Sequence, residues 1–177
     1  LTALGAIDRV IASNFDLRLS LSEILTHVLA ELKVDAADIL ILNPNLQTLE
    51  YGADSGFRTH LVRKAEVRLG EGYAGRVALD RQLVQIKNLE EDTDHSLLTT
   101  VLKDESFVCY FGIPLITKGQ VKGVLEVFNR SALDPDEEWL DFFTALAGQT
   151  SIALENAMLF ESQQHSNQEL ALAYDAT

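Results

Sequence analysis

The chain has 177 residues, of which 47% are hydrophobic and 23% charged, as is usual for one soluble globular domain. Its 14 Lys and Arg residues face 27 Asp and Glu residues, so the formal net charge at pH 7 is -13. Such a surface repels phosphate backbones and anionic lipids, so no nucleic-acid partner is expected, and no segment has the ~20 consecutive apolar residues of a membrane-spanning helix.

The first quarter of the chain predicts two helices followed by a hairpin. Apolar residues at helical spacing indicate a helix over 1–13. A second helix is predicted to begin at Ser20, because Ser20 and Glu23 have the spacing of a capping box. The segments 34–42 and 46–53, separated by an Asn-Pro-Asn turn, then read as two strands.

The middle of the chain predicts short elements and the second half predicts long ones. The short elements are strands at 66–69 and 83–87 and helices at 73–81 and 95–103. A stronger hairpin is expected from strands at 107–116 and 121–130, joined by a tight turn. Because tight turns rather than crossover helices join the strands, the pattern favours an α+β fold with an antiparallel sheet and the terminal helices on one face.

The last helix is the clearest element of the sequence. Asp134 is its expected N-cap, Pro135 its first residue and Glu137 the partner in a capping box. A 4-3 apolar spacing then extends the helix to about 40 residues, far beyond the usual ~12. Such a helix projects and pairs with a copy of itself or leads to another domain. The residues expected at a homodimer contact are Leu146, Ala153, Ala157 and Phe160.

Several motifs that resemble chemical sites have simpler interpretations. Residues 70–75 form a literal G-x-G-x-x-G, but the preceding strand is too short for a dinucleotide-binding unit, so a tight turn is predicted. Cys109, the single cysteine, is expected to be a buried structural residue in a reducing cytoplasm. The four histidines have no metal-ligand spacing, and no catalytic triad is visible. We therefore expect neither a metal site nor an enzyme.

Four sequence runs together resemble a GAF domain. They are RLGEGYAGRV at 68–77, LVQI at 83–86, GIPLITKGQVKGVLEV at 112–127 and LAGQTSIALENA at 146–157. The resemblance implies a six-stranded antiparallel sheet with terminal helices on one face and a small-molecule pocket on the other. It also implies a regulatory role in bacterial signalling, with the signal passed to an output domain.

The domain boundaries follow from this resemblance. A single GAF domain is expected over 1–160 and a projecting helix or linker over 161–177. The tail is similar to the linker that precedes HD-GYP cyclic di-GMP phosphodiesterase domains. Because the chain begins without Met and stops inside a helical pattern, we expect it to be part of a longer protein.

The resemblance also suggests which residues line a pocket. A carboxylate at the position of Glu126 faces the ligand in cyclic-nucleotide-binding relatives, and Leu98 and Leu102 would line a lid. Phe107 and Tyr110 are candidates on the strong strand, although periodicity does not decide which face of that strand meets the pocket.

The ligand and the alternatives to ligand binding stay open. The Asn-Lys, Phe, Asp-Glu pattern of cyclic-nucleotide relatives is present in altered form, as Asn129-Arg130, Leu133 and Asp136-Glu137. Bilin attachment and methionine sulfoxide reduction would need cysteines that the chain lacks. The sequence identifies no cofactor. The leading hypothesis is a non-enzymatic cytoplasmic sensor that dimerises, and its alternatives are a ligand-free dimerisation and linker module, a cyclic-nucleotide-binding domain and a small enzyme.

Overall fold

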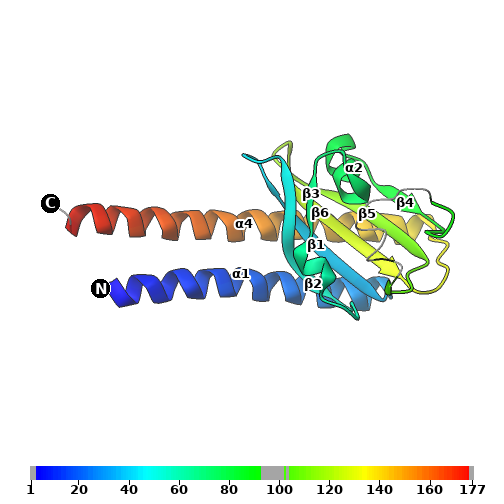
Figure 1. Cartoon of the computed structure of the whole chain (residues 1–177), viewed down its shortest axis with the longest axis horizontal. Coiled ribbons are helices and arrows are strands. Elements are labelled where there is room, and N and C mark those ends of the chain that lie inside the picture. Colours follow the sequence, from blue (N-terminus) through cyan, green and yellow to red (C-terminus); the bar gives the residue numbers. More distant parts are fainter. Residues whose placement is uncertain (1–2, 93–101, 103, 176–177) are drawn as a thin grey trace.

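The computed structural model describes residues 3–92, 102 and 104–175 (Figure 1). Its helices are α1 (Ala3–Leu32), the 3-10 helix η1 (Leu61–Lys64), α2 (Gly72–Asp80) and α4 (Glu137–Asp175). Its strands are β1 (Ala36–Asn43), β2 (Thr48–Ser55), β3 (Glu66–Arg68), β4 (Val84–Ile86), β5 (Cys109–Thr117) and β6 (Gln120–Asn129). The helix predicted at 95–103 lies outside the described residues, apart from Leu102.

The strands form one six-stranded sheet in the order β3-β2-β1-β6-β5-β4, and every neighbouring pair is antiparallel. The hairpins β1–β2 and β5–β6 supply the central strands, so the expected α+β fold is confirmed. In the first hairpin the amide of Gln47 donates to the carbonyl of Asn43 over 2.9 Å, closing the predicted turn. The central pairing of β1 with β6 joins segments far apart in the sequence, and this pairing creates the candidate site.

The two long helices cover one face of the sheet and α2 covers the other (Figure 1). Between the long helices and the sheet lies the main core, which includes Leu25, Val28, Phe111, Leu125 and Phe143. Beyond the sheet, α1 and α4 continue side by side, and the two chain termini lie at the same end of the molecule. Within the described residues, no helix is long and apolar enough to cross a membrane.

The N-terminal part of the chain corrects the prediction of two helices. One helix, α1, runs from Ala3 to Leu32, and Ser20 lies inside it rather than at its start. No Gly or Pro occurs between residues 6 and 32, so nothing interrupts the helix. Leu21, Leu25 and Val28 place one continuous buried stripe against the sheet. The capping-box spacing at Ser20 therefore occurs in the helix interior.

Helix α4 begins two residues later than predicted, at Glu137 instead of Pro135. Asp136, not Asp134, is the N-cap, because its Oδ1 accepts a hydrogen bond of 2.8 Å from the amide of Trp139. Asp134 instead pairs with Lys87 over 3.2 Å at the surface. The unusual length is confirmed, since α4 contains 39 residues.

Candidate functional site

A row of three acidic residues crosses the centre of the sheet on the face that α2 covers. Asp38 on β1 is paired directly with Asp54 on β2 and with Glu126 on β6. Directly paired residues of antiparallel strands project from the same face, so the three carboxyl groups are neighbours. We refer to Asp54, Asp38 and Glu126 as the acidic row. Asp38 and Glu126 are fully buried.

The members of the acidic row differ in their hydrogen-bond donors. Asp54 accepts a hydrogen bond from the Tyr51 hydroxyl and lies 3.3 Å from Nε of Arg63. Glu126 accepts a hydrogen bond through Oε2 from the Tyr110 hydroxyl. Both oxygens of Asp38 and Oε1 of Glu126 receive no donor from the described residues. The middle of the row is thus the place where negative charge is least compensated.

Burial and mutual repulsion raise the pKa values of the central pair. The pKa of Asp38 lies well above its usual range, first because burial disfavours its charged form and then because the Glu126 carboxylate lies beside it. Burial also raises the pKa of Glu126, against the opposing effects of the neighbouring Asp38 carboxyl and the Tyr110 hydroxyl. Both shifts favour protonated carboxyl groups over two adjacent negative charges.

Gly112 makes room for the donor to Glu126. It lies on β5 opposite Glu126, and a Cβ placed there would be only 2.3 Å from the Tyr110 hydroxyl oxygen and 2.9 Å from Val77. The absence of a side chain therefore lets the Tyr110 ring lie along the sheet and reach the carboxylate. Burial, and then the Glu126 charge, raise the pKa of Tyr110 well above its usual value, so its hydroxyl remains a donor.

Apolar side chains enclose the acidic row on both sides. Asp38 lies between Ala36 and Leu40, which belong to two separate apolar clusters, and Glu126 lies between Val124 and Phe128 of the same two clusters. Four of the five predicted pocket residues are described, and they gather on this face. Leu102, Phe107 and Tyr110 share one cluster, and Glu126 borders it; Leu98 lies outside the described residues.

The space around these residues is filled by the chain's own aromatic rings. The ring of Tyr73 on α2 lies 4.9 Å from that of Tyr110, and Phe107 stacks on Phe128 at 4.9 Å. A molecule that approached the acidic row would therefore have to displace some of these rings.

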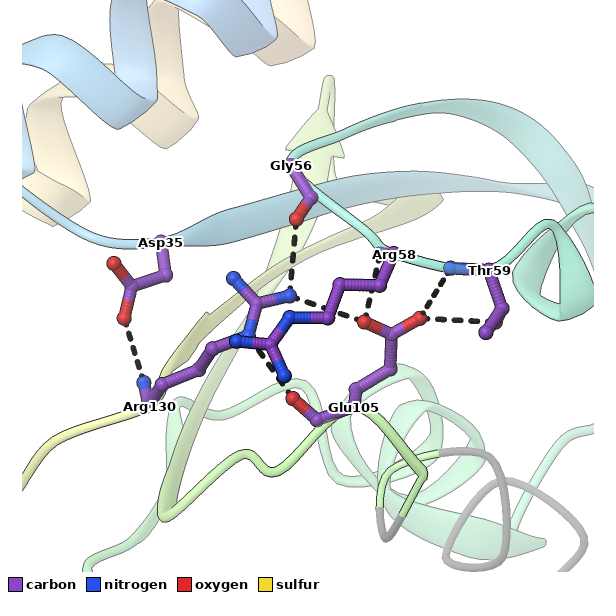
Figure 2. Close-up of polar contacts among 6 residues, drawn as sticks. All are labelled: Asp35, Gly56, Arg58, Thr59, Glu105 and Arg130. Atoms are coloured by element: carbon purple, nitrogen blue, oxygen red, sulfur yellow. Dashed lines mark hydrogen bonds and ion pairs between the residues drawn. The ribbon is translucent and has the colours of Figure 1, made fainter.

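A second polar cluster connects four loop segments, which precede β1 and β5 and follow β2 and β6 (Figure 2). The buried carboxylate of Glu105 accepts hydrogen bonds from the amides of Arg58 and Thr59, each 2.8 Å long, and from Nη2 of Arg130 at 3.0 Å. Arg130 also donates to the carbonyls of Glu105 and Gly56, while Asp35 accepts from its amide. We call this cluster the Glu105 clamp.

The clamp explains a pattern that resembled nucleotide binding. Burial alone would raise the pKa of Glu105, but its four donors outweigh burial and hold the pKa below its ordinary value. Arg130 is thus engaged by an internal carboxylate. Asn129 accepts from the amide of Asp35 and donates to Ser131, and Asp136 caps α4. In this chain the altered Asn-Arg and Asp-Glu pattern contributes to structure.

The remaining motifs have structural roles. The amide of Gly70 donates to the carbonyl of Gly75 over 2.8 Å, closing the turn that leads into α2. Cys109 is a free, buried thiol on the face of the sheet that α1 and α4 cover, and burial raises its pKa. Among the described residues, no three His, Cys, Asp or Glu side chains are grouped so as to hold a metal ion.

The predicted dimer residues occupy different positions on α4. Leu146 is buried in the main core and also lines a groove of about 450 Å³ between α1 and α4. Ala153 lines the same groove, together with Ile24 and His27 of α1. Ala157 is half-buried, whereas Phe160, three residues further along the helix, is 50% exposed.

Sequence reasoning missed Asp38, Asp54 and Glu105. The one signal for Asp38 was an acidic residue inside an otherwise apolar strand, which is costly unless a partner compensates it. Its partner Glu126 is 88 positions away, so their contact depends on the pairing of β1 with β6. Glu105 lies in a loop where an acidic residue is unremarkable.

Fold and site define an α+β domain with a buried polar centre on one side of its sheet and a helix pair on the other. The chain belongs to the GAF domain family, whose model matches residues 18–155. A comparison with functionally curated proteins finds no significant match.

Solved structures agree with this assignment. The chain is similar to the GAF domain of an Acinetobacter phosphoenolpyruvate-protein phosphotransferase, with 23% identity and a TM-score of 0.70 over 90% of this chain and 97% of that chain. It is also similar to the GAF domain of a Bacillus halodurans two-component sensor histidine kinase, with 19% identity and a TM-score of 0.68 over 79% and 97%.

A third similar structure is a type II free methionine-R-sulfoxide reductase from Thermoplasma acidophilum, with 14% identity and a TM-score of 0.66 over 81% of this chain and 96% of that chain. At these identities the structural likeness establishes the fold. Membership of the GAF domain family supports a sensory or regulatory role.

Proposed function

We propose that this GAF domain is a non-enzymatic sensor of bacterial signal transduction that binds a small molecule at the acidic row. The observation that carries the proposal is the buried pair of Asp38 and Glu126, which leaves three carboxyl oxygens without donors from the described residues. A buried polar group without a partner costs about 1–3 kcal/mol. Departures of this kind from good core packing concentrate at functional sites.

The fold connects this site to α4, so ligand binding could change the position of that helix. Glu126 lies on β6, and β6 leads through Arg130 of the Glu105 clamp to the start of α4. A shift of β6 would thus reach the helix that runs past the sheet. We propose an output domain in the same parent protein; the cyclic di-GMP phosphodiesterase indicated by the tail at 161–177 is one such output, and a cytoplasmic location fits it.

Native mass spectrometry of freshly purified protein tests the ligand directly. Native and denaturing spectra are compared for the wild type, Asp38→Asn and Asp141→Asn, a matched change at an exposed position of α4. We expect a reproducible non-covalent mass on the wild type and on Asp141→Asn that is lost from Asp38→Asn. The same bound mass on all three proteins would place the ligand elsewhere.

A ligand-free dimerisation and linker module is the second candidate function. It is favoured by the packing of Tyr73, Tyr110, Phe107 and Phe128, which fill the face opposite the long helices. Under this alternative no compound changes the amide spectrum of β1, β5 and β6, and the domain acts through the long helices alone.

Homodimerisation through α1 and α4 is part of the proposal in either case. The groove between the two helices exposes apolar surface at Ile24 and Ala153. Further along α4, the side chains of Leu159, Phe160, Leu170 and Leu172 are 50% to 69% exposed. A second copy of the same helix pair would cover these positions and form a four-helix contact.

Two other functions are less well supported by the site. The similarity to a methionine sulfoxide reductase suggests a thiol-based enzyme as an alternative. This chain, however, has one cysteine, and it is buried beneath the long helices. Cyclic-nucleotide binding would place a phosphate near the acidic row, where like charges repel. We therefore propose neither function.

A further inference from the structure

Three buried oxygens beside one another define what an occupant of the acidic row must supply. They are Oδ1 and Oδ2 of Asp38 and Oε1 of Glu126. Two donors beside the row are engaged elsewhere, since Tyr110 donates to Oε2 of Glu126 and Arg63 lies against Asp54. An occupant that presents several N–H groups to this point would supply the hydrogen bonds that the protein does not.

Charge decides the class of that occupant. Asp38 lies directly between two other acidic residues. Within the described residues, Asp54 is the one member of the acidic row with an ion pair, to Arg63. An anion would meet repulsion from the row, while a cation would allow Asp38 and Glu126 to ionise together. A metal ion is not favoured, because Asp54 and Glu126 lie on opposite sides of Asp38 and no three ligating side chains converge on one point among the residues described.

The apolar residues around the carboxyl pair indicate what kind of group would be attached to the cationic head. Aromatic rings of Tyr73, Tyr110 and Phe128 lie on one side of the carboxyl pair, and aliphatic residues such as Leu40 and Val124 lie on the other. An aromatic face attracts a desolvated cation, and the aliphatic wall accepts a short apolar group. The surroundings thus fit a charged head with a small hydrophobic body.

We propose that Asp38 and Glu126 bind the ammonium or amidinium head of a small organic cation. The inference rests on the proposed small-molecule site and specifies its ligand class. The positive charge of the head group favours the ionised form of both carboxyl groups, and a proton held by either group passes to solvent when the cation binds. The Tyr110 hydroxyl continues to hold Oε2 of Glu126 and orients the carboxylate toward the head group.

The test uses simple cations and their uncharged counterparts on the whole 177-residue chain. Methylammonium, acetamidine and benzamidine chlorides are titrated into isotopically labelled protein, with acetamide and benzamide as neutral isosteres. Amide shifts of Asp38, Gly112 and Glu126 report occupancy. We expect at least one amidine to bind about tenfold or more tightly than its amide, a difference of about 1.4 kcal/mol.

Variants connect this binding to the carboxyl pair. Asp38→Asn should weaken amidine binding about tenfold or more, whereas Asp141→Asn on the exposed surface of α4 should bind like the wild type. Asp38→Asn keeps the shape of the side chain and removes a group that is costly to ionise when buried, so the variant is expected to fold. Equal binding of amidines and amides, or unchanged binding by Asp38→Asn, would overturn the proposal.

A wider screen separates this proposal from the sensory function on which it rests. If a neutral or anionic metabolite shifts the amides of Gly112 and Glu126 while the cations do not, the small-molecule site stands and the cation proposal fails. If no compound of any charge shifts these amides, both proposals fail and the ligand-free module is the better account.

Discussion

At the scale of single residues, Asp38 is the main departure from good packing in this domain. It lies in a central strand, its side chain is fully buried, and its direct partners on both neighbouring strands are acids. Glu105 shows the opposite solution, since it is equally buried but receives four hydrogen bonds. The contrast separates an acid that stabilises the fold from one that costs stability.

The unfolding free energy should rise when Asp38 is replaced by Asn. Because the folded pKa of Asp38 is raised, folded and unfolded chains are both protonated below the unfolded-state pKa of ~3.9, and above it only the unfolded chain releases its proton. Wild-type stability therefore falls as pH rises from about 4 toward neutrality. Asp38→Asn removes this loss, and we expect a gain of about 1–3 kcal/mol at pH 7.

Urea denaturation at pH 4 and at pH 7 measures this effect. The stability difference between Asp38→Asn and the wild type should widen with pH, while Asp141→Asn should follow the wild type at both values. A variant that is less stable than the wild type at pH 7 would contradict the assignment of a raised pKa to Asp38. A stabilised variant that also loses ligand binding would fit the exchange of stability for function seen in binding sites.

At the scale of elements, the sequence predicts most strands and misplaces some helix ends. The described strands agree with the predicted ones to within a few residues, because each is a short apolar run between turn residues. The predicted break before Ser20 was wrong because a capping-box spacing also fits the interior of an uninterrupted helix. Local patterns identify an element more reliably than its ends.

The same limit applies to the candidate site. The family resemblance directed attention to Tyr110 and Glu126, which do meet on the face that α2 covers. Asp38 was missed because its importance arises from the register of β1 with β6, which no local pattern encodes. The Glu105 clamp was missed for a similar reason, since it joins Glu105 to Arg130 across 25 positions.

The Glu105 clamp should be essential for holding loop ends to the sheet. Arg130→Ala leaves the buried Glu105 carboxylate without its cation, and we expect the unfolding free energy to fall by about 3–5 kcal/mol. Arg58→Ala is the matched control, because Arg58 binds Glu105 through its amide and its side chain is exposed. Chemical denaturation at pH 7 measures both variants.

The pH dependence of the clamp supplies an independent check. The folded pKa of Glu105 is lowered, so its stabilising contribution is present above the unfolded pKa of ~4.3 and is lost as the pH falls through the folded value. Arg130→Ala should reduce this acid sensitivity. If Arg130→Ala and Arg58→Ala cost the same, the ion pair with Glu105 is not what holds the loops.

At the scale of the whole molecule, the candidate ligand site and the candidate dimer contact lie on opposite faces of the sheet. The acidic row and the aromatic cover lie on one face of the sheet, and the long helices lie on the other, so the sheet separates the candidate ligand from the candidate partner. Strand β6 contributes Glu126 to the site and leads into α4, and the Glu105 clamp fastens that connection (Figures 1 and 2). Helix α4 is therefore connected directly to a strand that forms the candidate site.

If a second copy covers the helix pair, one charge in the groove should separate the copies without unfolding either. Ala153 is half-buried and lines the groove, so Ala153→Glu would place a carboxylate in the contact and weaken association by about tenfold or more. Ala145→Glu makes the same change at an exposed position of α4 outside the groove and should leave association unchanged. Sedimentation equilibrium measures the mass of each protein, and circular dichroism confirms its helix content. A wild type that remains monomeric at high micromolar concentration would contradict the dimer, and so would equal dimerisation of Ala153→Glu and Ala145→Glu.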